Sequence, residues 1–522
     1  MKKQRIPDSE SARPEAPPVT SRLWQHLPVV LILCAASIVI LSNLGNQYLW
    51  QDEAQTALIA KTVMAHGIPL GTDGKNSFSQ DLGAEYGKDH IWRWHPWFQF
   101  YLLAGFFAVF GTSTFVARLP FALFGIATVV LTYYFGRSLW DSRRAAIASA
   151  AVLTLSVPFL LMSRQCRYYG PDAFFALLGL YGYLRLLERK KYASVTFVAS
   201  AVLLFHTHYL HYAALLCAVI AHSLLCRRDK FRMVLLLSAG TVILNLPWVI
   251  IFSTTGQVVE NYGNLWGRMA LLGKEYSLQI SRHIFPPALL LLALLVGVVN
   301  WLRRRQLPTI RGAASRNLAL LLLFAAGVFV GAVAMSLSFR PTLPFFRFLA
   351  PLIPVACLII GLILESSMKL HPAVGIAAVV ALAYTGHMPD YLYEITHDYD
   401  GPVEGIVKYL KAHGTRNDVV AITYEDLPVK FYTDMRVVGG LTGEDLSPAL
   451  EADWVIIRRY THCTVDLGVA RYLMENLPRE RYRQITLDYP DTPFENREDP
   501  EWHRFRTATD EAPVLVFQRI RK

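Results

Sequence analysis

Two adjacent carboxylates, Asp52 and Glu53, lie in an unusual place in the chain. They follow the first long apolar run, which ends near Leu41, and no Lys or Arg lies close to them. Acidic residues beside a membrane-length apolar segment usually mark a water-filled functional site. Because successive helical residues point about 100° apart, at most one of the two faces a given site. We take Asp52 as the candidate general base for a hydroxyl group, although Asp52 could instead cap a helix over 52–66.

A second polar cluster reads Arg-Gln-Cys-Arg-Tyr-Tyr-Gly-Pro-Asp from Arg164 to Asp172, at the end of another apolar run. Arginine side chains bind phosphate groups through paired hydrogen bonds, and Tyr hydroxyls donate to phosphate oxygens. The alternative is an Arg–Asp pair that ties two helices together. Asp172 cannot neutralise both Arg164 and Arg167, so the cluster favours phosphate or substrate binding in which Tyr168 and Tyr169 take part.

The remaining polar candidates also lie at the ends of apolar runs. The motif His206-Thr207-His208-Tyr209-Leu210-His211 has spacings at which zinc could bind, but a turn rich in amphipathic rings at the lipid–water boundary is the simpler explanation. Basic side chains beside apolar runs either extend to the headgroups or bind a lipid phosphate. The basic candidates are Arg118, Arg340 and Arg347. Lys274 lies in a polar segment that could cover an acceptor, although a solvated face is the simpler explanation.

The elements that must position these residues are membrane helices. The chain has 522 residues, of which 53% are hydrophobic and 17% are charged, and the hydrophobic residues form long blocks. A block of about 20 apolar residues is long enough to cross a bilayer. The formal charge of +11 requires no nucleic acid, because membrane proteins collect Lys and Arg on their cytoplasmic loops. The expected spans are 27–44, 116–136, 144–162, 171–187, 193–208, 210–226, 232–252, 286–302, 317–338, 346–364 and 371–388.

The short apolar run from Trp97 to Phe110 decides the topology. If 97–110 lies along the interface, the strongest Lys/Arg clusters of the first 390 residues all fall on one side, which the positive-inside rule makes cytoplasmic. If 97–110 crossed the bilayer, most of these clusters would move outside. We therefore predict an interfacial helix at 97–110, about eleven spanning helices, a cytoplasmic N-terminus and a C-terminus on the outer face.

This topology divides the chain into three expected parts. Residues 1–26 form a cytoplasmic tail, and residues 27–389 form a membrane module whose first outer loop covers 44–95. Residues 390–522 form an outer domain, in which apolar runs of strand length alternate with helix-like segments, as is typical of a small α/β domain. The unusual polar residues gather on the outer side, so the working site is expected there.

Several short motifs occur in an order that resembles the C-type membrane glycosyltransferases (GT-C). The resemblance covers roughly residues 27–390 and is strongest to the branch of the protein O-mannosyltransferases and the bacterial lipid A aminoarabinose transferases. Trp97 and Phe348 replace a proline and a tyrosine that are usual in this branch. The motifs are Trp50-Gln51-Asp52-Glu53-Ala54, His95-Pro96-Trp97, Ala117-Arg118-Leu119-Pro120, Arg137-Ser138-Leu139-Trp140, Arg164 to Tyr169, and Arg347-Phe348-Leu349-Ala350-Pro351.

The resemblance implies the GT-C fold and an inverting transfer of a sugar from a polyprenyl-phosphate-linked donor to an acceptor hydroxyl. The reaction would occur on the outer (periplasmic) face of a bacterial inner membrane, with a lipid, glycan or protein as acceptor and Asp52, beside Glu53, as the base. The cations expected to stabilise the leaving phosphate are Arg118, Arg164, Arg167, Arg340, Arg347 and His95. The other expected substrate contacts are Tyr168, Tyr169, Asp172, His206, His208 and Lys274. Because several arginines can neutralise a monophosphate, no obligatory metal or other cofactor is expected.

Two other functions stay open at this point. An oligosaccharide ligase or polymerase would use a diphosphate-linked donor. A lipid-linked sugar transporter or flippase would need polar groups through the membrane to both faces, and transporters often show internal repeats. Here the spans carry almost no charge in their middles and no repeat is evident, which favours an enzyme that acts at an interface.

Overall fold

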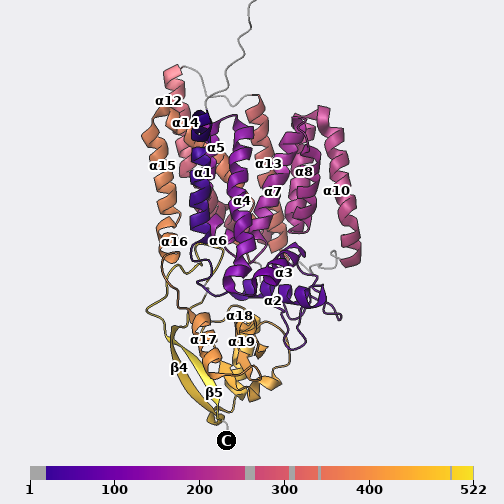
Figure 1. Ribbon diagram of the computed structural model, residues 1–522, viewed down its shortest axis with the longest axis vertical. Coiled ribbons are helices and arrows are strands. Elements are labelled where there is room, and N and C mark those ends of the chain that lie inside the picture. Colours follow the sequence, from indigo (N-terminus) through magenta and orange to yellow (C-terminus); the bar gives the residue numbers. More distant parts are fainter. Residues whose placement is uncertain (1–18, 253–264, 305–311, 339–342, 494–495, 521–522) are drawn as a thin grey trace, which may run out of the picture.

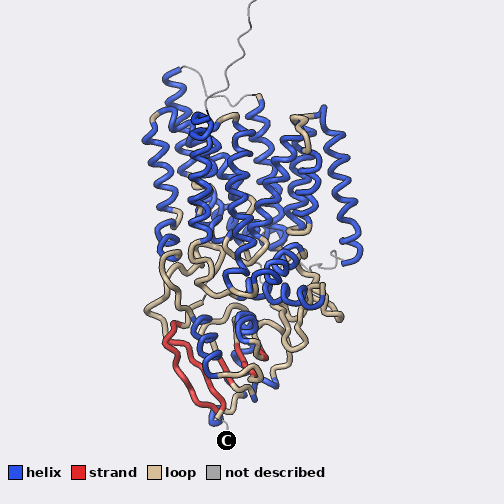
Figure 2. The backbone as a smooth tube through the Cα atoms, viewed as in Figure 1, coloured by secondary structure: helices blue, strands red, loops and turns tan. Residues whose placement is uncertain are grey.

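The computed structural model describes residues 19–252, 265–304, 312–338, 343–493 and 496–520. A bundle of long helices forms one end of the molecule, and a small α/β unit forms the other end (Figure 1). Figure 2 shows that the strands among the described residues all lie in this α/β unit. The predicted fold class, a polytopic helical bundle with a small C-terminal α/β part, is therefore confirmed.

Each predicted span coincides with a helix, or with a pair of helices, of the bundle. By length and composition, five of the described helices could cross a membrane, and up to eight could if each bent pair is one span. The shorter apolar helices include Leu27–Leu41 and Ala193–Phe205. The bundle helices are α1 (Val19–Leu41), α4 (Thr114–Trp140), α5 (Arg143–Thr154), α6 (Val157–Ser163), α7 (Tyr169–Leu187), α8 (Ala193–Phe205), α9 (Tyr209–Cys226), α10 (Phe231–Phe252), α11 (Leu265–Gln279), α12 (Ala288–Arg304), α13 (Ala313–Ser336), α14 (Leu352–Leu370) and α15 (Pro372–Thr385).

Three breaks interrupt the bundle where the sequence predicts uniform spans or loops. The α5–α6 pair bends by 64° just before Pro158, and α15 meets α16 (Met388–Glu394) at 56° just before Pro389. Proline removes a backbone donor and clashes with the preceding turn, so a helix breaks there. Helix α11, which the sequence did not predict, ends in a short π-helical turn and bends by 66° into α12.

Helices α2 (Gln51–His66) and α3 (Phe98–Phe110) lie across the end of the bundle, between it and the α/β unit (Figure 1). Both helices were predicted from the sequence. Helix α3 has 13 residues, as does α8, but α3 lies across the end of the bundle instead of within it (Figure 1). Val109 and Phe110 at its end are exposed. This crosswise position of a short apolar helix fits the predicted interfacial placement.

The α/β unit contains a five-stranded sheet in the order β2-β1-β3-β5-β4. Strands β2, β1 and β3 are parallel, whereas β5 runs antiparallel to β3 and β4. The sequence predicts helices at 403–413 and 465–476 and strands at 418–423, 454–458, 482–487 and 514–517, so β2 and α18 are the elements that it does not predict. The elements are α17 (Pro402–His413), β1 (Val419–Ile422), α18 (Asp426–Thr433), β2 (Arg436–Gly439), β3 (Trp454–Ile456), α19 (Thr464–Asn476), β4 (Tyr482–Pro490) and β5 (Pro513–Arg519).

The carboxyl ends of the parallel strands point to the membrane module. Helix α18 follows β1, and its Asp426 carboxylate accepts a hydrogen bond of 2.8 Å from the Gln51 side chain at the start of α2. The Tyr432 hydroxyl on the same helix accepts a bond of 2.9 Å from the Leu49 amide. Loops at this edge of a parallel sheet are where α/β folds place their ligand contacts. The α/β unit therefore presents this edge of its sheet to the segment that carries Asp52.

Candidate active site

Asp52 is the second residue of helix α2 and does not cap it. The helix begins at Gln51, and Trp50 occupies the capping position with an extended backbone. The alternative that Asp52 is an N-cap is therefore wrong. A carboxylate in the first turn is favoured by the partial positive charge at a helix N-terminus. The Asp52 side chain is 12% exposed, so it is shielded from bulk water but remains accessible.

Two arginines from distant segments hold the Asp52 carboxylate. Arg347 Nη1 lies 2.5 Å from Asp52 Oδ2, and Arg167 Nη2 lies 3.6 Å from the same oxygen. Arg167 Nη1 also donates to the Asp52 carbonyl and to the Thr56 hydroxyl, each at 3.1 Å. Two of the motifs singled out in the sequence thus meet the acidic motif in space. A carboxylate flanked by cations is suited to a reaction in which an acid–base group and an anion must be held together.

The ionisation of Asp52 follows from these contacts. Burial alone would raise the pKa of the Asp52 carboxyl, but the charges of Arg167, Arg347 and Arg497 outweigh burial and hold this pKa well below its usual value. The group is therefore an anion at neutral pH. A bound anion that attracts the same arginines would weaken their hold and make the Asp52 carboxylate more basic.

Glu53 is in a different environment from its neighbour. Its side chain is fully buried and accepts hydrogen bonds from Arg118 Nε at 2.8 Å and Nη2 at 2.7 Å. It also accepts from the Cys166 amide at 2.7 Å and from the Asn496 side chain at 3.1 Å. Each Glu53 oxygen thus already has protein partners. Within the described chain Glu53 joins segments of the protein and does not face the Asp52 cluster.

Arg118 and Arg164 bind backbone carbonyls in the turn after α1. Arg118 Nη1 donates to the carbonyls of Leu44 and Gln47 at 3.0 and 2.8 Å. Arg164 Nη1 donates to Ser42 at 2.6 Å, and its Nη2 donates to Asn43 at 3.2 Å. These contacts position the chain that leads to Asp52.

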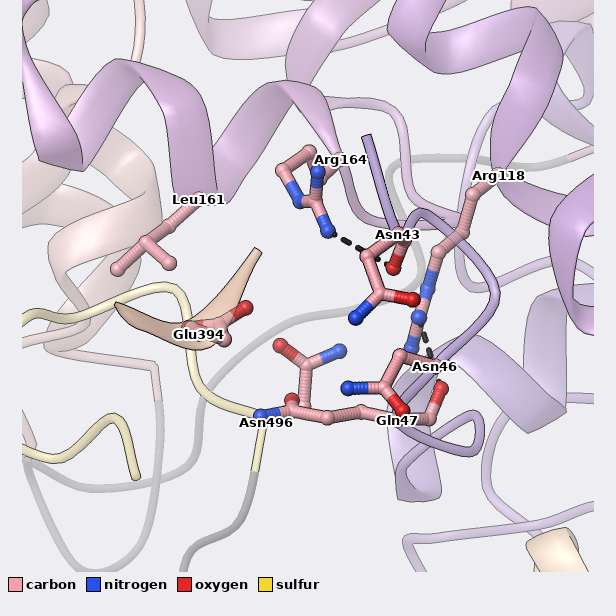
Figure 3. A pocket seen from close by; sticks show the side chains of 8 residues that line it. All are labelled: Asn43, Asn46, Gln47, Arg118, Leu161, Arg164, Glu394 and Asn496. Carbon is pink, nitrogen blue, oxygen red and sulfur yellow. Dashed lines mark hydrogen bonds between the residues drawn. The ribbon is translucent and has the colours of Figure 1, made fainter. Parts of the chain in front are cut away.

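Figure 3 shows the small pocket beside these two arginines. Its volume of about 10 Å³ is room for about one water molecule. A sugar phosphate does not fit there. The geometry therefore does not direct Arg118 or Arg164 at a donor phosphate.

His95, Tyr168 and Tyr169 lie around the Asp52 cluster. His95 Nε2 is 3.5 Å from Arg167 Nη2. Burial and the charge of Arg167 lower the pKa of His95 well below its usual value, so this ring is neutral and supplies hydrogen bonds but no charge. The Tyr168 ring packs between His95 and His208, and the Tyr169 ring contacts Tyr168 edge-on. These rings form one wall of the site.

Asp172 and His208 form a buried group with His211, beside this wall. Asp172 Oδ2 lies 2.7 Å from His211 Nδ1, and His211 Nε2 lies 3.0 Å from the Phe348 carbonyl next to Arg347. The His208 ring stacks on His211 at 3.8 Å. Possible ligand atoms of the three residues lie within 4.8 Å of one another, a separation at which they could hold a metal ion. Both His211 nitrogens already have protein partners, however, and through Phe348 they position the Arg347 segment.

Two of the remaining predicted residues, His206 and Lys274, lie outside the Asp52 cluster. His206 packs against Trp248, with ring centroids 5.0 Å apart. Lys274 is exposed on α11, and among the described residues no hydrogen bond or ion pair joins it to Asp52. Arg340 lies outside the described residues. Of the residues predicted from the sequence, the cluster therefore contains Asp52, Arg167, Arg347, His95 and the two tyrosines 168 and 169.

The sequence did not reveal that the α/β unit contributes to this cluster. Arg497 lies with its guanidinium carbon 4.3 Å from the centre of the Trp50 ring, and its Nη2 donates to the Tyr424 hydroxyl at 3.2 Å. Glu498 Oε1 is 3.9 Å from Arg347 Nε. The sequence feature that could have indicated this contribution is the connection 491–512. It joins two predicted strands and is far longer than an ordinary hairpin loop.

Comparison with known sequences gives two matches to parts of this chain. The model of the dolichyl-phosphate-mannose-protein mannosyltransferase family matches residues 94–251. An uncharacterised protein of Aquifex aeolicus (strain VF5) is 28% identical over 163 residues, which are 31% of this chain and 30% of that protein. The matched part thus spans less than a third of that relative.

Comparison with solved structures gives matches over nearly the whole chain. ArnT from Cupriavidus metallidurans in its apo state has a TM-score of 0.54 at 14% identity and covers 95% of this chain and 98% of its own. The same protein bound to undecaprenyl phosphate has a TM-score of 0.53 at 14% identity, covering 96% and 98%. The apo oligosaccharyltransferase of Archaeoglobus fulgidus has a TM-score of 0.55 at 12% identity, covering 91% of this chain and 75% of its own.

Proposed function

Because this chain has the fold of the C-type membrane glycosyltransferases, we propose that it is an inverting glycosyltransferase with a polyprenyl-phosphate-linked sugar as donor. The observation that carries the proposal is the Asp52 carboxylate between Arg167 and Arg347. The site lies where the helical bundle meets the α/β unit (Figure 1). This is where a lipid-anchored donor and an acceptor from outside the membrane can meet.

The proposed reaction is a single displacement. The donor phosphodiester binds Arg347 and Arg167, and the two arginines then interact less strongly with Asp52. The Asp52 carboxylate therefore becomes a stronger base. Asp52 takes the proton of the acceptor hydroxyl, and the acceptor oxygen attacks the anomeric carbon from the face opposite the phosphate. The bond between this carbon and the phosphate oxygen breaks, and its electron pair leaves with polyprenyl phosphate. The arginines stabilise the charge that develops on this leaving group.

The donor class is supported by the comparisons. The matching family model is named for transfer from a dolichyl-phosphate-linked mannose. The ArnT structure with undecaprenyl phosphate shows that a protein of this fold binds a polyprenyl monophosphate. An acceptor that is a lipid, a glycan or a protein is compatible with the site, since Asp52 needs only a hydroxyl group.

The charge distribution supports an outer placement of the site. The basic segments Arg137–Arg144, Arg185–Lys191 and Arg227–Arg232 join successive helices of the bundle. Helix α4 begins beside α3 and runs away from the α/β unit (Figure 1), so its basic end lies at the opposite end of the bundle. By the positive-inside rule that end is cytoplasmic. The site and the α/β unit would then face the periplasm of a bacterial inner membrane.

The proposal is tested with the purified full chain in nanodiscs, with lipid, glycan and peptide acceptors, and with a panel of sugars linked to polyprenol through a monophosphate or a diphosphate. We expect release of polyprenyl phosphate from at least one donor, together with a new glycoside of inverted anomeric configuration. The configuration is read by NMR of the product. A retained configuration, or release only from diphosphate-linked donors, would contradict the proposed reaction.

We further propose that transfer needs no bound metal, because Arg167 and Arg347 supply the charge that a monophosphate leaving group requires. Prior treatment with EDTA is expected to change the rate of polyprenyl phosphate release by less than about twofold. A loss of rate that Mn²⁺, Mg²⁺ or Zn²⁺ restores would refute this expectation. The group of Asp172, His208 and His211 would then be the first place to look for the ion.

A further inference from the structure

We propose that Arg497, in the connection between β4 and β5, is a further donor-binding residue, and that the donor phosphate lies between Arg497 and Arg347. This inference rests on the proposed function. It adds that the site is incomplete without the α/β unit, which supplies the third arginine. The residues that carry it are Arg497, Glu498 and Tyr424, none of which belongs to the motifs in the membrane module.

Described residues of the connection 491–512 contact the membrane module on both sides of Arg497. His503 Nε2 lies 2.6 Å from Glu394 Oε2 at the end of α16. The Asn496 side chain donates to Glu53 at 3.1 Å, directly beside Asp52. These contacts on both sides of Arg497 bring it to the start of α2. Its position is thus set by buried contacts and not by an exposed loop.

The direction of the Arg497 side chain is also fixed. Its guanidinium lies over the Trp50 ring at 4.3 Å, a distance at which a cation is attracted by the ring face. Its Nη2 donates to the Tyr424 hydroxyl at 3.2 Å. Trp50 and Tyr424 are both buried. A guanidinium held in this way keeps a planar set of donors beside Asp52, as two-point recognition of a phosphate requires.

The charged groups around Asp52 have a net positive charge that equals in size the single negative charge of a phosphodiester. Arg167, Arg347 and Arg497 face the carboxylates of Asp52 and Glu498, so three cations meet two anions. His462, which stacks on Tyr424, adds no charge at neutral pH, because burial and Arg497 lower its pKa to about 4. The net charge of the cluster is therefore one positive unit. The phosphodiester of a polyprenyl-phosphate sugar carries one negative charge.

Buried polar atoms without protein partners point to the same ligand. In the described part of the chain, the Tyr169 hydroxyl, Glu498 Oε2 and Arg167 Nε are buried and have no hydrogen-bond partner. Buried polar groups nearly always have one. All three side chains belong to the cluster, since Tyr169 interacts electrostatically with Glu498 and Arg347. A sugar phosphate supplies acceptor oxygens for Tyr169 and Arg167 and hydroxyl donors for Glu498.

The test compares Arg497→Gln, Arg497→Lys and a matched control, Arg506→Gln, in the full chain. Arg506 lies on the same connection but is largely exposed, where it pairs with Asp390 at 3.4 Å. For Arg497→Gln we expect the KM for the donor to rise about tenfold or more, as for a lost charge-assisted hydrogen bond, with an unchanged KM for the acceptor. Arg497→Lys is expected to lie between Gln and wild type, and Arg506→Gln is expected to match wild type.

Titration with polyprenyl phosphate alone separates failure of this inference from failure of the proposed function. We expect Arg497→Gln to bind this lipid about tenfold or more weakly than wild type. If wild type binds the lipid and transfers sugar, but both Arg497 variants bind and transfer equally well, the inference is wrong and the proposed function stands. If the Gln variant only melts earlier with the donor KM unchanged, Arg497 is a packing residue. If wild type neither binds the lipid nor transfers sugar, both proposals fail.

Discussion

Asp52→Asn is expected to lower the rate of sugar transfer by about a thousandfold or more, because the amide cannot accept the proton of the acceptor hydroxyl. The substitution keeps the size and shape of the side chain. Arg347 retains Glu498 as a partner, and Arg167 retains the Asp52 carbonyl and the Thr56 hydroxyl. We therefore expect the folded protein to persist. The measurement is single-turnover release of polyprenyl phosphate, with the melting temperature recorded on the same sample.

Asp89→Asn is the matched control for this prediction. Asp89 lies between α2 and α3, its side chain is 46% exposed, and it pairs with Arg93 at 2.6 Å. Its substitution is expected to leave the rate unchanged. Transfer by Asp52→Asn at a rate close to wild type would remove Asp52 from the mechanism. Binding of polyprenyl phosphate by this variant is expected to persist, because the arginines that hold the phosphate are intact.

The sequence predicts the elements well where apolar runs are long. The spans, the helix over 52–66, the short helix at 97–110 and most of the sheet follow from hydrophobic pattern alone. Strand β2 has only two apolar residues, which lie between an Arg and a Gly, and the eight-residue helix α18 contains a proline, so neither segment gives a clear pattern. The broken spans were missed because a proline near a helix start can either begin a helix or break a longer one.

The sequence predicts the partners of the arginines less well than it predicts the helices. Arg164 and Arg167 occur in one motif, and the sequence predicts phosphate binding for both. In the structure Arg164 donates to carbonyls after α1, whereas Arg167 pairs with Asp52. Arg164 caps the end of α6, whereas Arg167 lies in the non-helical turn before α7. The direction of each side chain therefore depends on the conformation of this turn and on the packing of α1, which the motif does not reveal. Motif order identifies the site, but the partner of each cation depends on the folded chain.

The contribution of the α/β unit could not be derived from local patterns. Arg497 is far from Asp52 along the chain, and no motif of the membrane module includes it. Its approach to Asp52 depends on the contacts of the connection 491–512 with Glu394 and Glu53. Such contacts join segments that the sequence presents as separate parts. A long polar connection between two strands is the local signal that a segment has a further role.

Glu53→Gln is expected to destabilise the folded protein by about 3–5 kcal/mol, since it leaves the buried guanidinium of Arg118 without its counter-charge. Glu53 is fully buried and Arg118 almost so, with 2.7 Å between Oε2 and Nη2. Arg118→Gln is expected to have a similar effect, and the double variant is expected to lose less than the sum of the two. The measurement is thermal unfolding of each variant in the same detergent.

Substitutions of the two adjacent acids are thus expected to have opposite effects on transfer and on stability, and one set of variants tests both. Asp52→Asn is expected to abolish transfer and leave the melting temperature unchanged, whereas Glu53→Gln is expected to lower the melting temperature. Any Glu53→Gln protein that remains folded should still release polyprenyl phosphate, because Asp52, Arg167 and Arg347 are intact. A Glu53→Gln variant as stable as wild type but inactive would assign the base to Glu53. Since helix neighbours point in different directions, only one of the two acids can take that role.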